Sequence, residues 1–161
     1  MSVLPEIHVC VQTEDFDVSH ELKAIDAAQP HNCGAAVSFV GRVRGKDTDT
    51  PLSHLWLTHL PLVTETEIRR IVQAACKRWA ISYAKVIHRI GKIDAGEQIV
   101  LVLTASPHRD AAYQANRCIM DYLKTEAPFW KKECFVNGEA HWAEMKASDA
   151  ARTQAWQDAA E

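Results

Sequence analysis

The sequence has little of the material from which nucleotide-binding loops and metal centres are built. It contains only 6 glycines in 161 residues, and it has neither a phosphate-binding P-loop nor a dinucleotide-binding glycine motif. Its 8 histidines lack H-x-H and H-E-x-x-H spacing, and its 5 cysteines form no C-x-x-C pair. We therefore expect no metal ion, no cofactor and no disulfide framework, and we expect reduced thiols in a cytoplasmic protein.

An excess of one charge sign and a long apolar run are also missing. The balance of 18 Lys+Arg against 21 Asp+Glu argues against a nucleic-acid partner, because binding to a phosphate backbone needs a basic excess. The longest apolar run, residues 99–103, is too short to cross a membrane, and the first 17 residues do not resemble a signal peptide. The composition that is present, 47% hydrophobic and 24% charged, is typical of a single globular domain over residues 1–161.

Apolar alternation and turn residues predict strands, and apolar residues at helical spacing predict helices. We expect strands at 7–13, 35–43, 52–60, 83–90 and 98–105, with residues 91 and 94–96 turning the last two into a hairpin. Asn137-Gly138 predicts a second hairpin, which pairs 131–136 with 139–145. We expect helices at 18–28, from a capping box at 64–67 to 79, from an N-cap at Ser106-Pro107 to 127, and after Ser148. Because strands and helices mix without regular βαβ alternation, the fold class is α+β.

His108 and Arg109 stand in the first turn of the helix predicted after Pro107. The helix macrodipole disfavours cations at that end. One interpretation is an anion site, in which free backbone N–H groups, an imidazole and a guanidinium converge on a phosphate or carboxylate. The other is that Asp110 compensates the charge and both basic side chains face water.

Lys124 lies near the end of the same predicted helix, and Pro128 then reverses the chain toward Lys131. Two close ammonium groups lower each other's pKa, and such a lysine can act as a nucleophile or a general base. The alternative is two independent surface lysines. The spacing of Asp121 from Arg117 and from Lys124 favours solvated ion pairs on this helix face.

Residues 119–125 (Ile-Met-Asp-Tyr-Leu-Lys-Thr) and 127–133 (Ala-Pro-Phe-Trp-Lys-Lys-Glu) resemble the signature of the large, catalytic subunit of molybdopterin synthase. Further similar blocks lie at 39–44, 86–91, 96–97 and 106–109, so the resemblance extends over residues 34–149. It implies an α/β hammerhead fold with an additional antiparallel β-sheet. It also implies a sulfurtransferase that converts cyclic pyranopterin monophosphate into the dithiolene molybdopterin during molybdenum cofactor biosynthesis.

The same resemblance implies partners and a reaction sequence. The sulfur comes from a small ubiquitin-like carrier subunit whose C-terminal Gly-Gly carries a thiocarboxylate, and whose tail threads into a pocket of the large subunit. Two large subunits form a homodimer within a heterotetramer. The thiocarboxylate sulfur attacks a substrate carbon, water releases the carrier, and a second carrier repeats the step at the adjacent carbon.

The resemblance also implies the residues of the site. The catalytic pair is Lys124 and Lys131. The residues implied to bind the substrate phosphate and pterin, or to line the pocket, are Phe39, Arg44, His108, Arg109, Met120 and Glu133.

Phe39 and Arg44 would lie on opposite faces of an ideal strand, so we expect a bulge at Gly41 to bring them together. The chain departs from the family pattern at Thr58, His59, Leu60 and Leu62, and at Lys146, where an arginine is common. Two other readings remain: a phosphate- or pterin-binding module without chemistry, and a scaffold that only docks the carrier.

Overall fold

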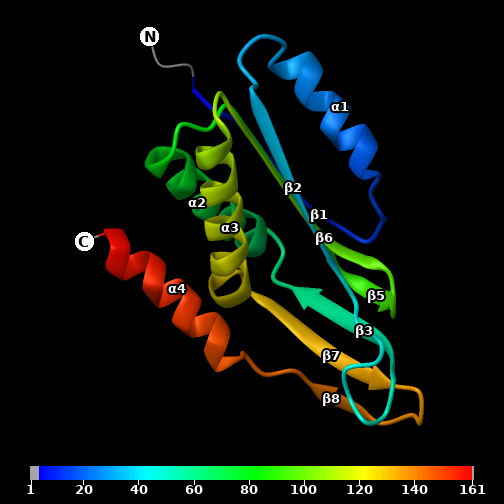
Figure 1. Cartoon of the computed structure of the whole chain (residues 1–161). Helices are drawn as coiled ribbons and strands as arrows, with labels where there is room; N and C mark the ends of the chain where they lie inside the picture. The colour runs from blue at the N-terminus through cyan, green and yellow to red at the C-terminus, as the bar shows by residue number, and fades with distance from the viewer. Residues whose placement is uncertain (1–3, 161) are drawn as a thin grey trace.

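A computed structural model describes residues 4–160, which form two four-stranded sheets and four helices (Figure 1). The first sheet has the order β1-β4-β6-β2, and β1 runs parallel to β4 while the other neighbours are antiparallel. Its strands are β1 (Glu6–Gln12), β2 (Ala35–Arg42), β4 (Tyr83–Arg89) and β6 (Gln98–Ser106). The second sheet, of order β5-β3-β7-β8, is antiparallel throughout. Its strands are β3 (Leu52–His59), β5 (Gly91–Asp94), β7 (Phe129–Phe135) and β8 (Ala140–Trp142).

Helices cover both faces of the first sheet (Figure 1). Helix α1 (Val18–Ala28) lies on one face, while α2 (Val63–Arg78) and α3 (Arg109–Glu126) lie on the other. Alternate residues of the same strands supply the two cores, as the pleat requires: Leu101 and Leu103 face α1, whereas Val100 and Val102 face α2 and α3. Helix α4 (Ala147–Ala160) packs on the outside of α3. The α+β class and the added antiparallel sheet are therefore confirmed.

The connection between β4 and β6 differs from the predicted turn. Residues 91–94 form the separate strand β5, which leaves the first sheet and pairs with β3. Gly91 allows this departure because its φ of 79° is accessible to glycine. The strand places Ile93 in a third apolar cluster with Val43, Leu55 and Leu57. Because Ile93 is buried against the second sheet, residues 91–94 pair with β3 and do not form a simple turn between β4 and β6.

The predicted capping box at 64–67 is wrong. Helix α2 begins at Val63, after Leu62, which has a φ of 70°. The buried Thr64 hydroxyl accepts from the backbone N–H of Leu60 and donates to the carbonyl of Pro128, both at 3.0 Å. Thr64 therefore does not cap the helix, because its hydroxyl joins α2 to the turn that precedes β7.

The predicted N-cap at Ser106-Pro107 is also wrong. Ser106 is the last residue of β6 and still pairs with Ala35, and its hydroxyl donates to the carbonyl of His108. The N-cap is His108, which makes no side-chain capping bond, and the helix begins at Arg109. The sheet register takes precedence here over the local helix-start signal.

Two other turn predictions are confirmed. The register of β2 against β6 shifts between Gly41 and Arg42, where we expect a bulge. The hairpin that joins β7 to β8 turns at Asn137-Gly138, with a φ of 90° at Gly138 and a 3.0 Å hydrogen bond from the N–H of Glu139 to Asn137 Oδ1. The bulge does not, however, bring Phe39 and Arg44 to one cavity, because Phe39 lines a groove between β2 and α3 and Arg44 lines a separate cleft.

The expected ion pairs of Asp121 with Arg117 and Lys124 do not form. Its carboxylate instead accepts a 2.7 Å hydrogen bond from the indole N–H of Trp156 on α4. The periodicity of α3 alone could not show this, because the competing donor lies 35 residues further along the chain.

Candidate active site

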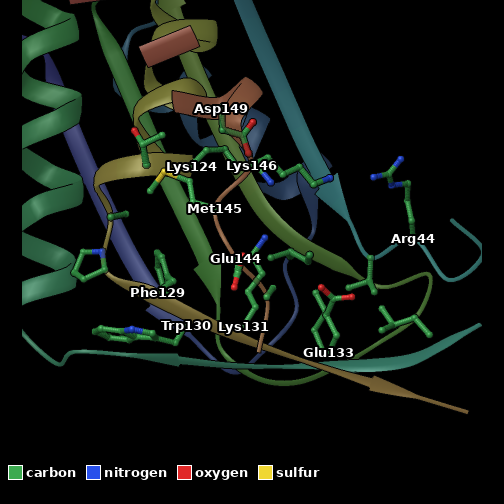
Figure 2. A pocket seen from close by; sticks show the side chains of 18 of the residues that line it. Arg44, Lys124, Phe129, Trp130, Lys131, Glu133, Glu144, Met145, Lys146 and Asp149 are labelled. Carbon is green, nitrogen blue, oxygen red and sulfur yellow. The ribbon is translucent and has the colours of Figure 1, made fainter. Parts of the chain in front are cut away.

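A cleft of about 560 Å³ opens where the C-terminal end of α3, the start of β7 and the β8–α4 connection meet (Figure 2). Three lysines line it, each from a different one of these segments: Lys124 from α3, Lys131 from β7 and Lys146 from the residues before α4. The chain reversal at Pro128 therefore brings Lys124 and Lys131 to one cleft.

The backbone around Lys131 is fixed from both sides. Pro128 cannot continue α3, so the helix ends and Ala127 takes an extended conformation. The carbonyl of Ala127 accepts from the N–H of Phe129 at 2.9 Å, and the carbonyl of Lys131 accepts from the N–H of Ala143 at 2.8 Å. Lys131 is thus held by the turn on one side and by the segment that leads to α4 on the other.

The surroundings of Lys131 disfavour its charged form. Burial and, to a smaller extent, the amino groups of Lys124 and Lys146 lower the pKa of Lys131 to about 8, and the carboxylate of Asp149 opposes them. With this pKa, about a tenth of the Lys131 side chains are uncharged at pH 7. The residue can therefore exchange a proton near neutral pH, which an ordinary surface lysine does rarely.

The nearby carboxylates do not neutralise the three lysines. Glu126 is paired with Arg70 at 2.8 Å, and Asp149 lies 3.3 Å from Arg152. Across residues 4–160, no ion pair within 4.0 Å includes Lys124, Lys131 or Lys146. The three ammonium groups are therefore available to an incoming anion, although the carboxylates of Glu133 and Glu144 also line the cleft.

A buried histidine lies close to the lysine pair. The ring of His88 stacks on Phe129 with centroids 3.8 Å apart, and its Nδ1 donates to the carbonyl of Arg89 at 2.8 Å. Burial lowers the pKa of His88 to about 4, and the charges of Lys131 and Lys124 act in the same direction. His88 is therefore neutral. Sequence reasoning gave it no role, and the only signal was its place in the family block at 86–91.

Four further predicted site residues lie in or beside the cleft. Arg44 and Glu133 line it, and Arg44 also pairs with Asp47 at 3.1 Å. Phe39 and Met120 line a neighbouring groove of about 450 Å³ between β2 and α3.

His108 and Arg109 lie elsewhere. Both are exposed at the N-terminal end of α3, and Arg109 precedes Lys124 by 15 positions on this helix. At about 1.5 Å per residue, the separation along the axis is about 22 Å. The structure therefore does not bring these two residues to the cleft of the same chain.

The segment before and into α4 contributes cleft residues that the sequence gave no site role. Glu144, Met145, Lys146 and Asp149 all line the cleft (Figure 2). The only signal was at Lys146, where the family pattern commonly has an arginine. A lysine there keeps the positive charge but loses the planar, two-pronged geometry of a guanidinium.

Among residues 4–160, no three His, Cys, Asp or Glu side chains gather as they would around a metal ion. None of the helices described there combines the length and apolarity needed to cross a bilayer.

The two-sheet α+β fold, with a cleft in which three lysines from separate segments meet, defines the class of protein. Comparison with known families gives the particular one. The family model described as MoaE protein matches residues 11–126. The chain belongs to the MoaE family.

Individual relatives extend the match over the whole chain. The molybdopterin synthase catalytic subunit of Mesorhizobium japonicum is 44% identical over 162 residues, covering 100% of both chains. The solved MoaE protein of Burkholderia ambifaria has a TM-score of 0.80 at 37% identity, covering 94% of this chain and 98% of that one. The fold is also similar to a complex of subunits 1 and 2 of the molybdopterin-converting factor from Helicobacter pylori, with a TM-score of 0.68 at 22% identity over 87% and 91% of the two chains.

Proposed function

We propose that this chain is the catalytic subunit of a molybdopterin synthase. It transfers sulfur from the C-terminal thiocarboxylate of a small ubiquitin-like carrier subunit to cyclic pyranopterin monophosphate. One observation carries the proposal: Lys124, Lys131 and Lys146 share a cleft, have no carboxylate within 4.0 Å, and include one side chain with a pKa of about 8. The relatives described above support it.

The charge of the cleft suits both reactants. A thiocarboxylate and a phosphate are anions, and bringing them together in water costs electrostatic repulsion. The three ammonium groups offset that repulsion in a partly enclosed site, where fixed charges act more strongly than in water. Arg44 at the same cleft adds a fourth cation for the phosphate or the pterin.

The chemistry needs one proton acceptor and one positioning cation. The thiocarboxylate sulfur attacks a substrate carbon and forms a carbon–sulfur bond, while a carbon–oxygen bond of that carbon breaks and its electron pair leaves with the oxygen, which takes up a proton. The carrier then remains attached as a thioester. Water then cleaves the thioester, so that the sulfur stays on the substrate and the carrier departs as a carboxylate. The lowered pKa of Lys131 supports its role as acceptor of the water proton, with Lys124 beside it as the cation that orients the carbonyl oxygen.

The groove beside the cleft supplies a path for the carrier tail. Phe39 and Met120 line it, and Met120 lies one helical turn before Lys124 on α3. An extended tail in this groove would lie one helical turn from Lys124. This path gives Phe39 and Met120 apolar contacts with the tail rather than contacts with the reacting atoms.

His108 and Arg109 need a second copy of the chain to take part. The distance of about 22 Å along α3 excludes them from the cleft of their own chain. We infer that, in the homodimer implied by the family, the α3 N-terminus of one copy reaches the cleft of the other. In this arrangement the imidazole and guanidinium of the second copy hold the substrate phosphate.

The decisive experiment combines the protein with thiocarboxylated carrier and cyclic pyranopterin monophosphate and measures the dithiolene product. Product formation that is lost in Lys131→Ala supports the proposal. Substrate binding without turnover would indicate a pterin-binding module, and carrier binding alone would indicate a docking scaffold. Either of these two results overturns the proposal.

A further inference from the structure

Helix α4 is held to the molecule by very few side chains. Along residues 147–160, Thr153 is buried and Trp156 is half-buried, while nearly all the others are exposed. A helix without a continuous apolar face gains little from burial, so its position depends on specific contacts. Those contacts all lie on α3 and at the end of α2.

The first contact is a group of four side chains, Arg78, Trp79, Asp121 and Trp156, which we call the clasp. The indole N–H of Trp156 donates to Asp121 Oδ2 at 2.7 Å. The Trp156 ring meets Trp79 edge-on at 5.5 Å. The guanidinium of Arg78 lies 4.8 Å from the Trp79 ring centre and 5.3 Å from that of Trp156, and it donates to the Trp156 carbonyl at 3.1 Å.

The second contact lies one turn earlier on α4. The hydroxyls of Thr153 and Thr125 are 2.7 Å apart, and Thr153 also donates to the carbonyl of Asp121 at 3.2 Å. Thr125 directly follows Lys124. The fastening of α4 therefore lies next to one of the proposed catalytic residues.

The other end of α4 forms a wall of the cleft. Lys146 precedes the helix and Asp149 lies in its first turn, and both line the cleft that holds Lys131 (Figure 2). The carboxylate of Asp149 is turned toward Arg152 at 3.3 Å. If α4 moved, both of these charges would leave the site together with the segment that shields it from water.

We propose that Trp156 and Asp121 are positioning residues for sulfur transfer: by clasping α4 to α3, they hold Lys146 and Asp149 against the cleft and keep Lys131 partly shielded from water. This inference rests on the proposed function. Neither residue touches the reacting atoms, because both act through the position of α4.

The sign of the effect follows from the groups around Lys131. Shielding from water and the charge of Lys146 both lower the pKa of Lys131, whereas Asp149 raises it and is the smallest of the contributions. If α4 is released, the shielding from water and the charges of Lys146 and Asp149 are all lost. The pKa of Lys131 then rises, because the two contributions that lower it outweigh the one that raises it. The titratable and charged groups that remain around the cleft come from α3, β2, β3, β4, β7 and the loops; they are Lys124, Glu126, Arg42, His59, His88, Glu133, Arg44, Asp47 and Glu144.

Three variants test the inference. Trp156→Ala removes the clasp, and Trp156→Phe keeps an aromatic ring but removes the N–H that donates to Asp121. Gln154→Ala is the matched control, because Gln154 is exposed on the same helix and bonds only to Asp158 there. The titration of Lys131 is followed by NMR of its side-chain methylene next to the amine, assigned with Lys131→Arg, and the docking of α4 is followed by amide exchange over residues 147–160.

In Trp156→Ala we expect the Lys131 midpoint to rise from about 8 toward the usual lysine value of about 10.4. In Trp156→Phe we expect amide exchange in α4 to become about tenfold faster, since a hydrogen bond to a charged group is lost, with a smaller rise of the midpoint. The turnover rate at pH 7 should fall about tenfold or more in Trp156→Ala with little change in carrier affinity. Gln154→Ala should match the wild type in all three measurements.

An unchanged Lys131 midpoint in Trp156→Ala, with α4 amides exchanging faster, would overturn the positioning role. Unchanged exchange in both Trp156 variants would show that the clasp does not hold α4, and it would overturn the inference as well. Both readouts are independent of turnover. A wild-type protein that makes no dithiolene would therefore refute the proposed function without affecting this measurement.

Discussion

The two ends of α3 carry basic residues in opposite situations. At the C-terminal end, Lys124 faces Lys131 in a cleft enclosed by β7 and the β8–α4 segment. At the N-terminal end, His108 and Arg109 are exposed, and neither belongs to an ion pair among the described residues. The macrodipole favours cations at the first end and disfavours them at the second.

A single chain encloses the lysine site at the C-terminal end of α3, whereas it leaves the basic residues at the N-terminal end exposed. Enclosure lowers the pKa of Lys131, so that end can move a proton by itself. The exposed end offers donors but no enclosure, and it becomes useful only when another molecule brings the anion. We therefore expect substitutions at the first end to affect turnover, and those at the second to affect substrate binding.

The largest effect is expected at the enclosed end. Lys124→Ala and Lys131→Ala should each reduce sulfur transfer from a thiocarboxylated carrier by about 10²–10⁴-fold, the usual cost of losing an acid–base group. Lys132→Ala is the control, because Lys132 neighbours Lys131 in sequence but does not line the cleft. A loss within about threefold in Lys124→Ala would remove that residue from the catalytic pair.

Arg109→Ala should weaken substrate binding about 10–100-fold, the range for one charge-assisted hydrogen bond, with a smaller effect on turnover at saturation.

A mixed dimer, with Arg109→Ala in one chain and Lys124→Ala in the other, sharpens the comparison. If the two ends meet across the dimer, one of its two sites is intact, and random mixing should restore about a quarter of wild-type activity. The assay is run far below substrate saturation, where Arg109→Ala is also nearly inactive. Mixed dimers no more active there than the two parents would show that both residues serve the same chain's site.

Lys131→Met should be inactive yet more stable at pH 7, by about 1–3 kcal/mol, because it removes a poorly solvated charge. The pKa of Lys131 is about 8 in the fold and about 10.4 when unfolded, so the unfolded chain binds more protons between these values. Wild-type stability should therefore rise with pH across this window, relative to Lys131→Met. Urea denaturation of both proteins at pH 7, 8, 9 and 10 measures the free energy of unfolding. If that free energy changes with pH in the same way in the two proteins, the result would contradict the shifted pKa of Lys131.

Lys146→Gln should have the smallest effect. It removes one of the minor causes of the lowered pKa, so the Lys131 midpoint should rise by less than about one unit. Lys146→Arg should leave the midpoint nearly unchanged, since the charge remains. NMR titration of Lys131 is compared in the wild type, Lys146→Gln and Lys146→Arg. A loss of charge shifts the midpoint only in Lys146→Gln, whereas a change in packing would shift it in both variants.

Much of the fold could be predicted because local signals and tertiary packing agree. Helix α1 begins and ends as its apolar spacing indicates, and the Asn137-Gly138 turn forms where the hairpin rule places it. The errors occur where one local signal competes with a distant partner. Thr64 bonds to Pro128, 64 residues away, and Ser106 remains paired to Ala35 in the sheet. Neither partner is visible within a helix-start motif.

The same reasoning explains what the sequence revealed of the site. The proximity of Lys124 and Lys131 could be predicted, because only a proline turn separates them. The separation of Arg109 from Lys124 could also have been derived, since 15 helical residues set it. The place of Lys146 and Asp149 in the cleft could not be predicted, because the segment that carries them is held by distant partners, through the N–H of Ala143 on the carbonyl of Lys131 and through Trp156 on Asp121.

The hydroxyl of Thr64 links the start of α2 to the turn before β7 through one oxygen atom. The position of the turn that leads to Lys131 therefore depends on a residue of α2, although no residue of α2 lines the cleft. Serine at position 64 would keep both bonds, whereas valine, equal in size, would cut both at once. A methyl-for-hydroxyl exchange at this one buried position would therefore alter the turn before Lys131 without replacing any side chain that lines the cleft.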